Sequence, residues 1–176
     1  MTHPTLTDDD VNQLTGQFTR SARRLETRRT YTVEVEAPAL AAFARGDRTP
    51  LTDYPYYRPW FAQIHAATAA GRTVQRIRIL DTPPTPYQEW EIWVAGFAAQ
   101  AGEDVRYLTR DHAQDLGVPT DHDWWLLDDS RLVHLLFDDH DRPLGGEVLT
   151  DPQIVQDHRA WWDLAAQHAT CTPPTD

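Results

Sequence analysis

Charged and phenolic side chains that can carry out chemistry gather in one part of the chain, residues 73–106. Arg76 and Arg78 lie two positions apart there, and Tyr87 and Glu91 follow with the spacing of one helical turn. A guanidinium group holds carboxylates and phosphates through charge-assisted hydrogen bonds, and a carboxylate beside a phenol can position or exchange a proton. These four side chains are our first candidates for a site, with Glu91 and Tyr87 in the catalytic role.

Glu91 falls at the edge of the apolar face of a helix that we predict over residues 87–101. The apolar arc of this helix collects Trp90, Trp93, Val94, Phe97, Ala98 and Ala101. A buried carboxylate without a partner is costly, and Arg76 and Arg78 are the nearest partners in sequence. Three interpretations stay open: a structural Arg–Glu network, a polar pocket in which arginine holds an anionic group, and a solvated Glu91.

Two segments alternate between apolar and polar residues and predict the strands beside this helix. RTYTVEVE, residues 29–36, and TVQRIRIL, residues 73–80, each place every second side chain on one face. If the two strands pair, Arg76 and Arg78 face Glu34 and Glu36 in a cross-strand charge ladder.

The remaining elements complete a mixed order of helices and strands. Thr85, Pro86 and Gln88 form a capping-box pattern at the start of the helix over residues 87–101. Further helices are predicted over residues 7–18, 38–43 and 60–71 and after Asp151, with strands over 103–109, 123–128, 131–137 and 147–150, a tight hairpin at 129–130, and a loop with one helical turn over 111–123. This order predicts an α+β fold, with a mixed, largely antiparallel sheet and helices packed mainly on one face.

Length and composition favour one globular domain. The 176 residues are 40% hydrophobic and suffice for a single core, with short flexible ends expected at about residues 1–6 and 171–176. The formal net charge is -11, and all 16 basic residues are arginine. This balance disfavours direct nucleic-acid binding. No run reaches membrane-spanning length, so we expect a cytoplasmic protein.

Metal and nucleophile motifs are absent from the sequence. The acidic segments at residues 121–123 and 138–141 contain histidine, but neither has a recognised ligand spacing, and His134 and His158 read as core histidines. The single cysteine, Cys171, excludes an intramolecular disulfide. We therefore predict no metal and no cofactor.

Several segments in order resemble an actinomycete domain family of unknown function, number six-eight-seven-nine. They are SARRLETRRTYTVEVE, VQRIRILDTPPTPYQEWEI, AGEDVRYL and DWWLLDDSRLVHLLFDDHDRPLGGEVLTD, and together they extend from about residue 17 to 168. Adding the positions that this resemblance marks to the arginine pair gives the candidate ligand-binding residues Arg24, Glu26, Arg76, Arg78, Glu103, Arg106, Trp125 and Asp128.

The resemblance implies no established activity, but proteins similar to this one are often encoded beside helix-turn-helix regulators. The first hypothesis is a bacterial regulatory or small-ligand-binding module, monomer or homodimer, whose partner is a small molecule or a protein such as a DNA-binding regulator. The alternative is a small cofactor-independent enzyme that acts on an anionic or amine-bearing metabolite through the Arg/Glu/Tyr pocket.

Overall fold

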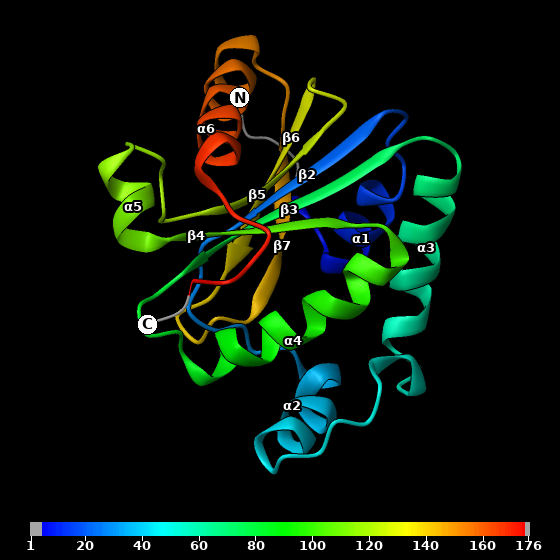
Figure 1. Ribbon diagram of the computed structural model, residues 1–176. Helices are drawn as coiled ribbons and strands as arrows, with labels where there is room; N and C mark the ends of the chain where they lie inside the picture. Colours follow the sequence, from blue (N-terminus) through cyan, green and yellow to red (C-terminus); the bar gives the residue numbers. More distant parts are fainter. Residues whose placement is uncertain (1–4, 175–176) are drawn as a thin grey trace.

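A single sheet runs through the computed structural model, which describes residues 5–174 (Figure 1). Its seven strands follow the order β1-β7-β6-β5-β2-β3-β4. Their bounds are β1 (Thr5–Leu6), β2 (Ser21–Glu26), β3 (Thr73–Leu80), β4 (Asp104–Thr109), β5 (Asp123–Leu127), β6 (Arg131–Phe137) and β7 (Pro143–Leu149). β2, β3 and β4 pair in parallel and the other pairings are antiparallel, which confirms the mixed, largely antiparallel sheet of an α+β fold.

Helices cover both faces of this sheet, with the larger share on one (Figure 1). That face packs against α1 (Asp8–Thr15), α2 (Ala37–Ala44), α3 (Tyr57–Ala69) and α4 (Pro86–Ala101). The opposite face packs against α5 (Arg110–Asp115) and α6 (Pro152–His168). Two short 3-10 helices, η1 (Glu34–Glu36) and η2 (Leu51–Asp53), lie in the connection between β2 and β3.

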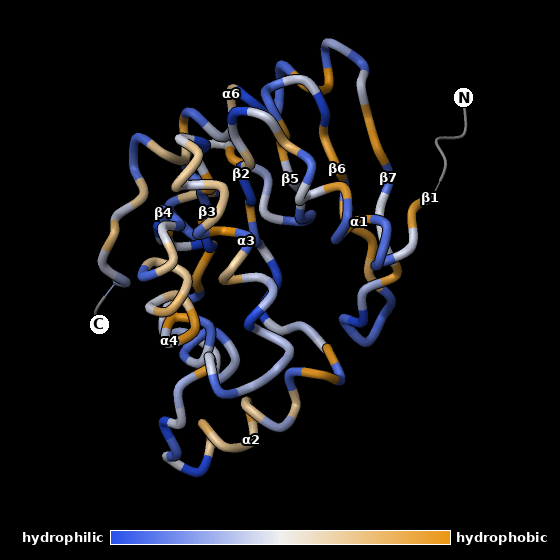
Figure 2. The backbone as a smooth tube through the Cα atoms, turned by 90° about the vertical axis from the view of Figure 1, so that its right-hand side faces the viewer, coloured by the Kyte–Doolittle hydropathy of each residue, from blue (hydrophilic) through white to orange (hydrophobic). Residues whose placement is uncertain are grey.

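The prediction of a strand over residues 29–36 is wrong. This segment is irregular and ends in η1, while the strand that pairs with β3 is β2, an element the hydrophobic pattern did not reveal. Alternation arises here because Tyr31 and Val33 point into a cavity while their neighbours face solvent. β2 escapes the pattern because Arg24 and Glu26 are buried in it by ion pairing; hydrophilic residues accordingly colour part of β2 and β3 in Figure 2.

Predictions that rest on local sequence signals agree with the structure for most of the other elements. The Thr85 hydroxyl accepts a hydrogen bond from the Gln88 amide at 3.1 Å, and the Gln88 side chain accepts one from the Thr85 amide at 3.0 Å, so the predicted capping box starts α4. β3, the helical turn now seen as α5 and the hairpin between β5 and β6 are also confirmed. α3 begins at Tyr57, one turn earlier than predicted, and β7 begins at Pro143.

The two ends of the chain lie only partly within the described residues. Residues 1–4 and 175–176, which are parts of the flexible ends predicted at about 1–6 and 171–176, are outside them. Thr5 and Leu6 form β1 and pair with Glu147 and Gly146 of β7. No helix within residues 5–174 has the length and apolar character that crossing a membrane requires.

Gly145 permits this pairing, and its substitution is our first test of the fold. Its φ is +104°, and an added Cβ would lie 1.9 Å from the Leu6 carbonyl oxygen. We expect Gly145→Ala to lower the free energy of unfolding by more than about 2 kcal/mol, since it combines backbone strain with a clash. Gly117→Ala is the matched control, because Gly117 also has a positive φ but open space around it. Equal losses in the two variants, measured by urea unfolding, would contradict this account of β1.

Candidate functional site

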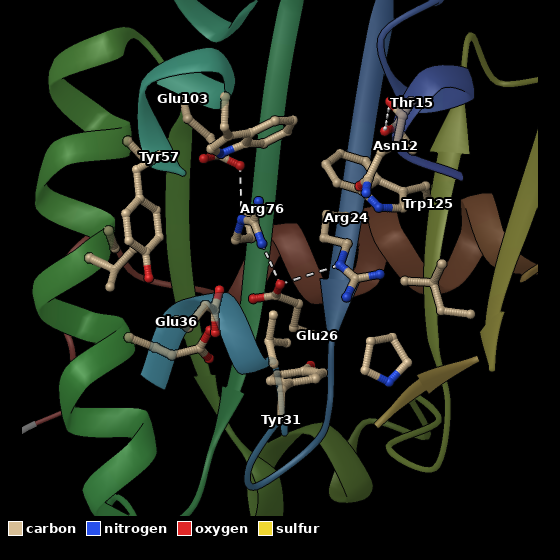
Figure 3. A pocket seen from close by; sticks show the side chains of 18 of the residues that line it. Asn12, Thr15, Arg24, Glu26, Tyr31, Glu36, Tyr57, Arg76, Glu103 and Trp125 are labelled. Carbon is tan, nitrogen blue, oxygen red and sulfur yellow. Dashed lines mark hydrogen bonds and ion pairs between the residues drawn. The ribbon is translucent and has the colours of Figure 1, made fainter. Parts of the chain in front are cut away.

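A cavity of about 390 Å³ lies between the sheet and the helices of its more heavily covered face (Figure 3). Its floor consists of side chains from β2 and β3, and its walls come from α1, α3, α4 and the irregular segment after β2. The volume falls in the range of about 300–1,000 Å³ typical of small-molecule sites.

The Glu26 carboxylate stands at the centre of the cavity floor and contacts three guanidinium groups. Its Oε1 pairs with Arg76 Nη1 and, at 3.3 Å, with Arg24 Nε. Its Oε2 lies 3.1 Å from Arg78 Nη2. The parallel register sets this geometry, because Arg24 stands beside Arg76 and Glu26 beside Arg78 on adjacent strands.

Each of these arginines also has a second carboxylate. Glu103 Oε1 accepts a hydrogen bond from Arg76 Nε at 2.8 Å, and Glu91 pairs with Arg78. Asp123 Oδ2 accepts one from Arg24 Nη2 at 3.1 Å. No guanidinium group therefore depends on a single counter-charge, although Arg24 Nη1 and Arg78 Nε are buried without a hydrogen-bond partner within residues 5–174.

Asp123 connects this network to the segment that follows β2. Its Oδ1 accepts hydrogen bonds from the Thr27 amide and hydroxyl, both at 2.8 Å, and its Oδ2 accepts one from the Tyr31 hydroxyl. With only 1% of its surface exposed, Asp123 fixes both the arginine side and the loop side of the cavity.

The ionisation of Glu26 reflects its three partners. Burial raises the pKa of the Glu26 carboxyl, but Arg76, Arg78 and Arg24 outweigh burial and lower the pKa to about 2. For Arg76, burial acts to lower the pKa, and the carboxylates of Glu103 and Glu26 reverse this and raise it. Glu26 and Arg76 are thus both charged at neutral pH.

Two tryptophans pack on the arginines and help to orient them. The Trp125 ring lies 5.6 Å from the Arg24 guanidinium carbon and 5.7 Å from that of Arg76. Trp60 of α3 approaches Arg76 at 5.8 Å. All three separations are within cation–π range, so aromatic side chains lie against the ion pairs.

A second acidic group, Glu36, lies away from the arginine network. Its Oε2 accepts a hydrogen bond from the Tyr87 hydroxyl at 3.0 Å. Burial raises the pKa of Glu36 to about 7, which the hydrogen bond from Tyr87 and the more distant charge of Arg78 only partly offset. Burial likewise raises the pKa of Tyr87, and the neighbouring Glu36 adds to the effect. Glu36 therefore changes its charge near neutral pH.

Eight of the ten residues proposed from the sequence line the cavity. They are Arg24, Glu26, Arg76, Arg78, Tyr87, Glu91, Glu103 and Trp125. The sequence had suggested that Arg76 and Arg78 face Glu34 and Glu36 in a ladder; this is wrong, because β2 rather than residues 29–36 pairs with β3.

The other two proposed residues lie outside the cavity lining. Arg106 pairs with Asp104 at 2.9 Å and donates to the Ala166 carbonyl at 3.3 Å, towards α6. The Asp128 carboxylate accepts hydrogen bonds from the backbone amides of Thr19, Arg20 and Ser21, with distances from 2.7 to 3.1 Å. Asp128 thus fixes the start of β2.

Residues that sequence reasoning did not assign to the site include Tyr31, Glu36, Tyr57 and Asp123. The first two lie in the segment predicted as a strand, where Tyr31 was assigned to the buried face and Glu36 to the opposite face, in the charge ladder with Arg76 and Arg78. Asp123 was considered as part of an acidic metal motif with His122, and nothing in the local sequence linked it to Arg24. For Tyr57, the available signal in the sequence was the segment rich in proline and tyrosine, residues 47–59, that leads into α3.

The histidines form a separate group under α6. His122 Nε2 lies 3.2 Å from His158 Nε2, and the Nδ1 atoms of the two rings lie 2.8 Å from Asp121 Oδ1 and the Ile154 carbonyl oxygen. Within residues 5–174, no group of three or more His, Cys, Asp or Glu side chains is arranged to hold a metal ion.

Comparison with known proteins gives a family and no activity. A family model described as "Domain of unknown function (DUF6879)" matches residues 9–173, almost the whole chain. No curated protein matches the sequence.

Removing the charge of Glu26 tests the network. We expect Glu26→Gln to lower the free energy of unfolding by about 3–5 kcal/mol, because three buried guanidinium groups lose their shared counter-charge. Since folding lowers the pKa of Glu26 to about 2 from 4.5, this contribution is present above pH 4.5 and is lost as the pH falls towards 2. Glu34→Gln, an exposed carboxylate, is the control. Urea unfolding with a loss under about 1 kcal/mol would show that the network is not stabilising.

Glu36 should show the opposite pH dependence. Its pKa is raised from 4.5 to about 7 in the folded protein, so the folded state binds the proton more tightly and loses stability as the pH rises from 4.5 through 7. We expect Glu36→Gln to stabilise the protein by about 1–3 kcal/mol at about pH 8 and to have little effect at about pH 5. Thermal unfolding at both pH values measures this. A stability difference from wild type that is the same at both would contradict the raised pKa.

Proposed function

This chain belongs to the family described as a domain of unknown function (DUF6879), and because that family supplies no activity, we propose from the cavity that the protein binds a small metabolite. The cavity is the observation that carries the proposal. Its floor is held in place by ion pairs from three arginines to Glu26, so the space does not need a ligand in order to form. Pre-formed concave sites with a few fixed polar groups are typical of ligand binding.

Binding accounts for the arrangement better than catalysis by Glu91. A carboxylate that is ion-paired with a buried guanidinium is a weak base, because the pair stabilises its ionised form. Glu91 is in that position with Arg78. Its role in the proposal is to fix α4 against β3.

An enzyme is the second candidate, and Glu36 is the observation that favours it. A pKa of about 7 suits a general acid or base at neutral pH, and the Tyr87 hydroxyl is already bonded to this carboxyl. In that case Glu36 would exchange the proton and the arginine network would only support the cavity. Turnover with a pH dependence that disappears in Glu36→Gln would distinguish this candidate from simple binding.

We further propose that the ligand-binding protein is cytoplasmic and regulates a DNA-binding partner. The net charge of -11 supports contact with a basic protein surface over contact with the phosphate backbone of DNA. In this version the ligand adjusts the affinity for the partner through the cavity walls.

Native mass spectrometry of protein purified gently from the organism that encodes it tests the binding proposal. We expect a small bound mass on the wild-type chain. Val94→Phe fills the cavity without removing a charge, since Val94 lines it and is only partly buried, so this variant should lose the mass. Arg106→Ala, outside the cavity, should retain it. An empty wild-type protein, or the same mass on Val94→Phe, would argue against a ligand in this cavity.

A further inference from the structure

We propose that the ligand carries a positively charged amine, and that its ammonium group sits against Glu36, between the side chains of Tyr57 and Tyr87. The proposal rests on the proposed function, because it names the class of ligand for the same cavity. It follows from the acidic side chains of the cavity that have no ion-pair partner within residues 5–174. The tyrosines near one of them, Glu36, support it further.

The positive charge of the cavity is already matched. Its lining contains three cationic side chains, Arg24, Arg76 and Arg78, and each contacts two carboxylates. An anionic ligand at these arginines would have to displace Glu26 or share its partners. Displacement would leave a buried carboxylate unpaired, which is strongly unfavourable. The floor is therefore poorly suited to an added anion.

The negative charge of the cavity is only partly matched. Among the acidic residues that line it, Glu26, Glu91 and Glu103 are ion-paired. Glu36 and Asp8 form no ion pair with any residue in the described part of the chain. Glu36 Oε2 accepts the Tyr87 hydrogen bond, and Oε1 accepts none within residues 5–174. An added cation would thus meet an acceptor that has no other partner.

Asp8 and Glu36 make this part of the cavity unfavourable for added negative charge. Partial desolvation raises the pKa of the Asp8 carboxyl although its side chain is exposed, the adjacent Asp9 raises it further, and Arg24 acts to lower it. The pKa of Tyr56 is raised to about 12 by burial and by the charges of Glu36 and Asp8. A bound ammonium group would relieve this repulsion, because it supplies the missing counter-charge.

Aromatic rings line the space around Glu36. Tyr87 packs with Tyr31 at 5.8 Å between ring centroids, and Tyr57 packs with Tyr56 at 5.0 Å. In Figure 3 the hydroxyl end of Tyr57 points towards the part of the cavity that holds Glu36. This buried hydroxyl has no hydrogen-bond partner within residues 5–174. A carboxylate beside an unpartnered tyrosine hydroxyl is suited to an ammonium group, which can donate hydrogen bonds to the carboxylate and to the Tyr57 oxygen.

The test uses three probes of similar shape and different charge: phenethylamine, 3-phenylpropionate and 2-phenylethanol. Binding is measured by isothermal titration calorimetry with the full-length protein at about pH 8. We expect phenethylamine to bind at least about tenfold more tightly than the other two, equivalent to about 1.4 kcal/mol. Phenylpropionate binding more tightly than phenethylamine, or no binding by phenethylamine at millimolar concentration, would overturn the amine site.

Binding measurements on two variants test whether the ammonium group contacts Glu36. Glu36→Gln keeps the shape of the side chain and should weaken phenethylamine binding at least about tenfold, while the binding of 2-phenylethanol stays unchanged. Glu34→Gln removes a charge two residues away at an exposed position and is the matched control. Equal losses in both variants would show that only long-range charge is involved and would overturn the assignment to Glu36. Tyr57→Phe tests the hydroxyl separately.

The pH dependence of binding gives a second readout. Phenethylamine should bind more weakly at about pH 5.5 than at about pH 8, because protonation of Glu36 removes the acceptor charge. The groups that affect the pKa of Glu36 are Tyr87 from α4, Arg78 and Arg76 from β3 and Glu26 from β2. Asp8 from α1, together with Tyr56 and Tyr57, also lines the cavity. A pH dependence that persists in Glu36→Gln would assign the titration to one of them and would overturn the role of Glu36.

The two proposals fail separately. If native mass spectrometry finds a bound metabolite that carries no amine, or if phenylpropionate is the probe that binds, the ligand-binding function stands and the amine class is wrong. If the wild-type protein is empty and none of the three probes binds, both proposals are wrong.

Discussion

The shared carboxylate of Glu26 is the interaction on which the rest of the site depends. Parallel pairing of β2 with β3 places Arg24 beside Arg76, two like charges on neighbouring central strands. Such a pair is tolerable within a protein only when carboxylates lie close to it. Glu26 supplies the first, Glu103 adds one from just before β4, Asp123 adds one from the start of β5, and α4 brings Glu91. The helix, both strand ends and the loop after β2 are therefore positioned by charge as well as by apolar packing.

The sequence predicted those parts of the fold that obey local rules. Thr85 and Gln88 define the start of α4 by their own hydrogen bonds. The polar turn at residues 129–130 connects the two apolar strands β5 and β6. The need of a buried carboxylate for a partner also led correctly from Glu91 to the arginines of β3. Each of these inferences uses residues that are near one another in the chain or a cost that any fold must meet.

Non-local interactions account for the errors. β2 is a central strand with charged residues, and the partners that allow Arg24 and Glu26 to be buried lie far along the chain, at positions such as Asp123. No periodicity in the segment reveals this. Tyr31 and Val33 alternate with exposed neighbours because one side of an extended segment faces a cavity, and that pattern is the same as the pattern of a half-buried strand.

The residues that line the cavity are distributed unevenly along the chain. Its charged floor comes from β2, β3 and α4, whereas Tyr31, Glu36, Tyr57 and Trp60 all belong to the single connection between β2 and β3, residues 27–72. Substitutions at Glu36 and Tyr57 can therefore reshape the recognition surface with little effect on the buried charges, whereas Tyr31 bonds to Asp123 and Trp60 packs on Arg76. Such a separation lets a lineage acquire new binding preferences through changes, insertions or recombination within one contiguous segment.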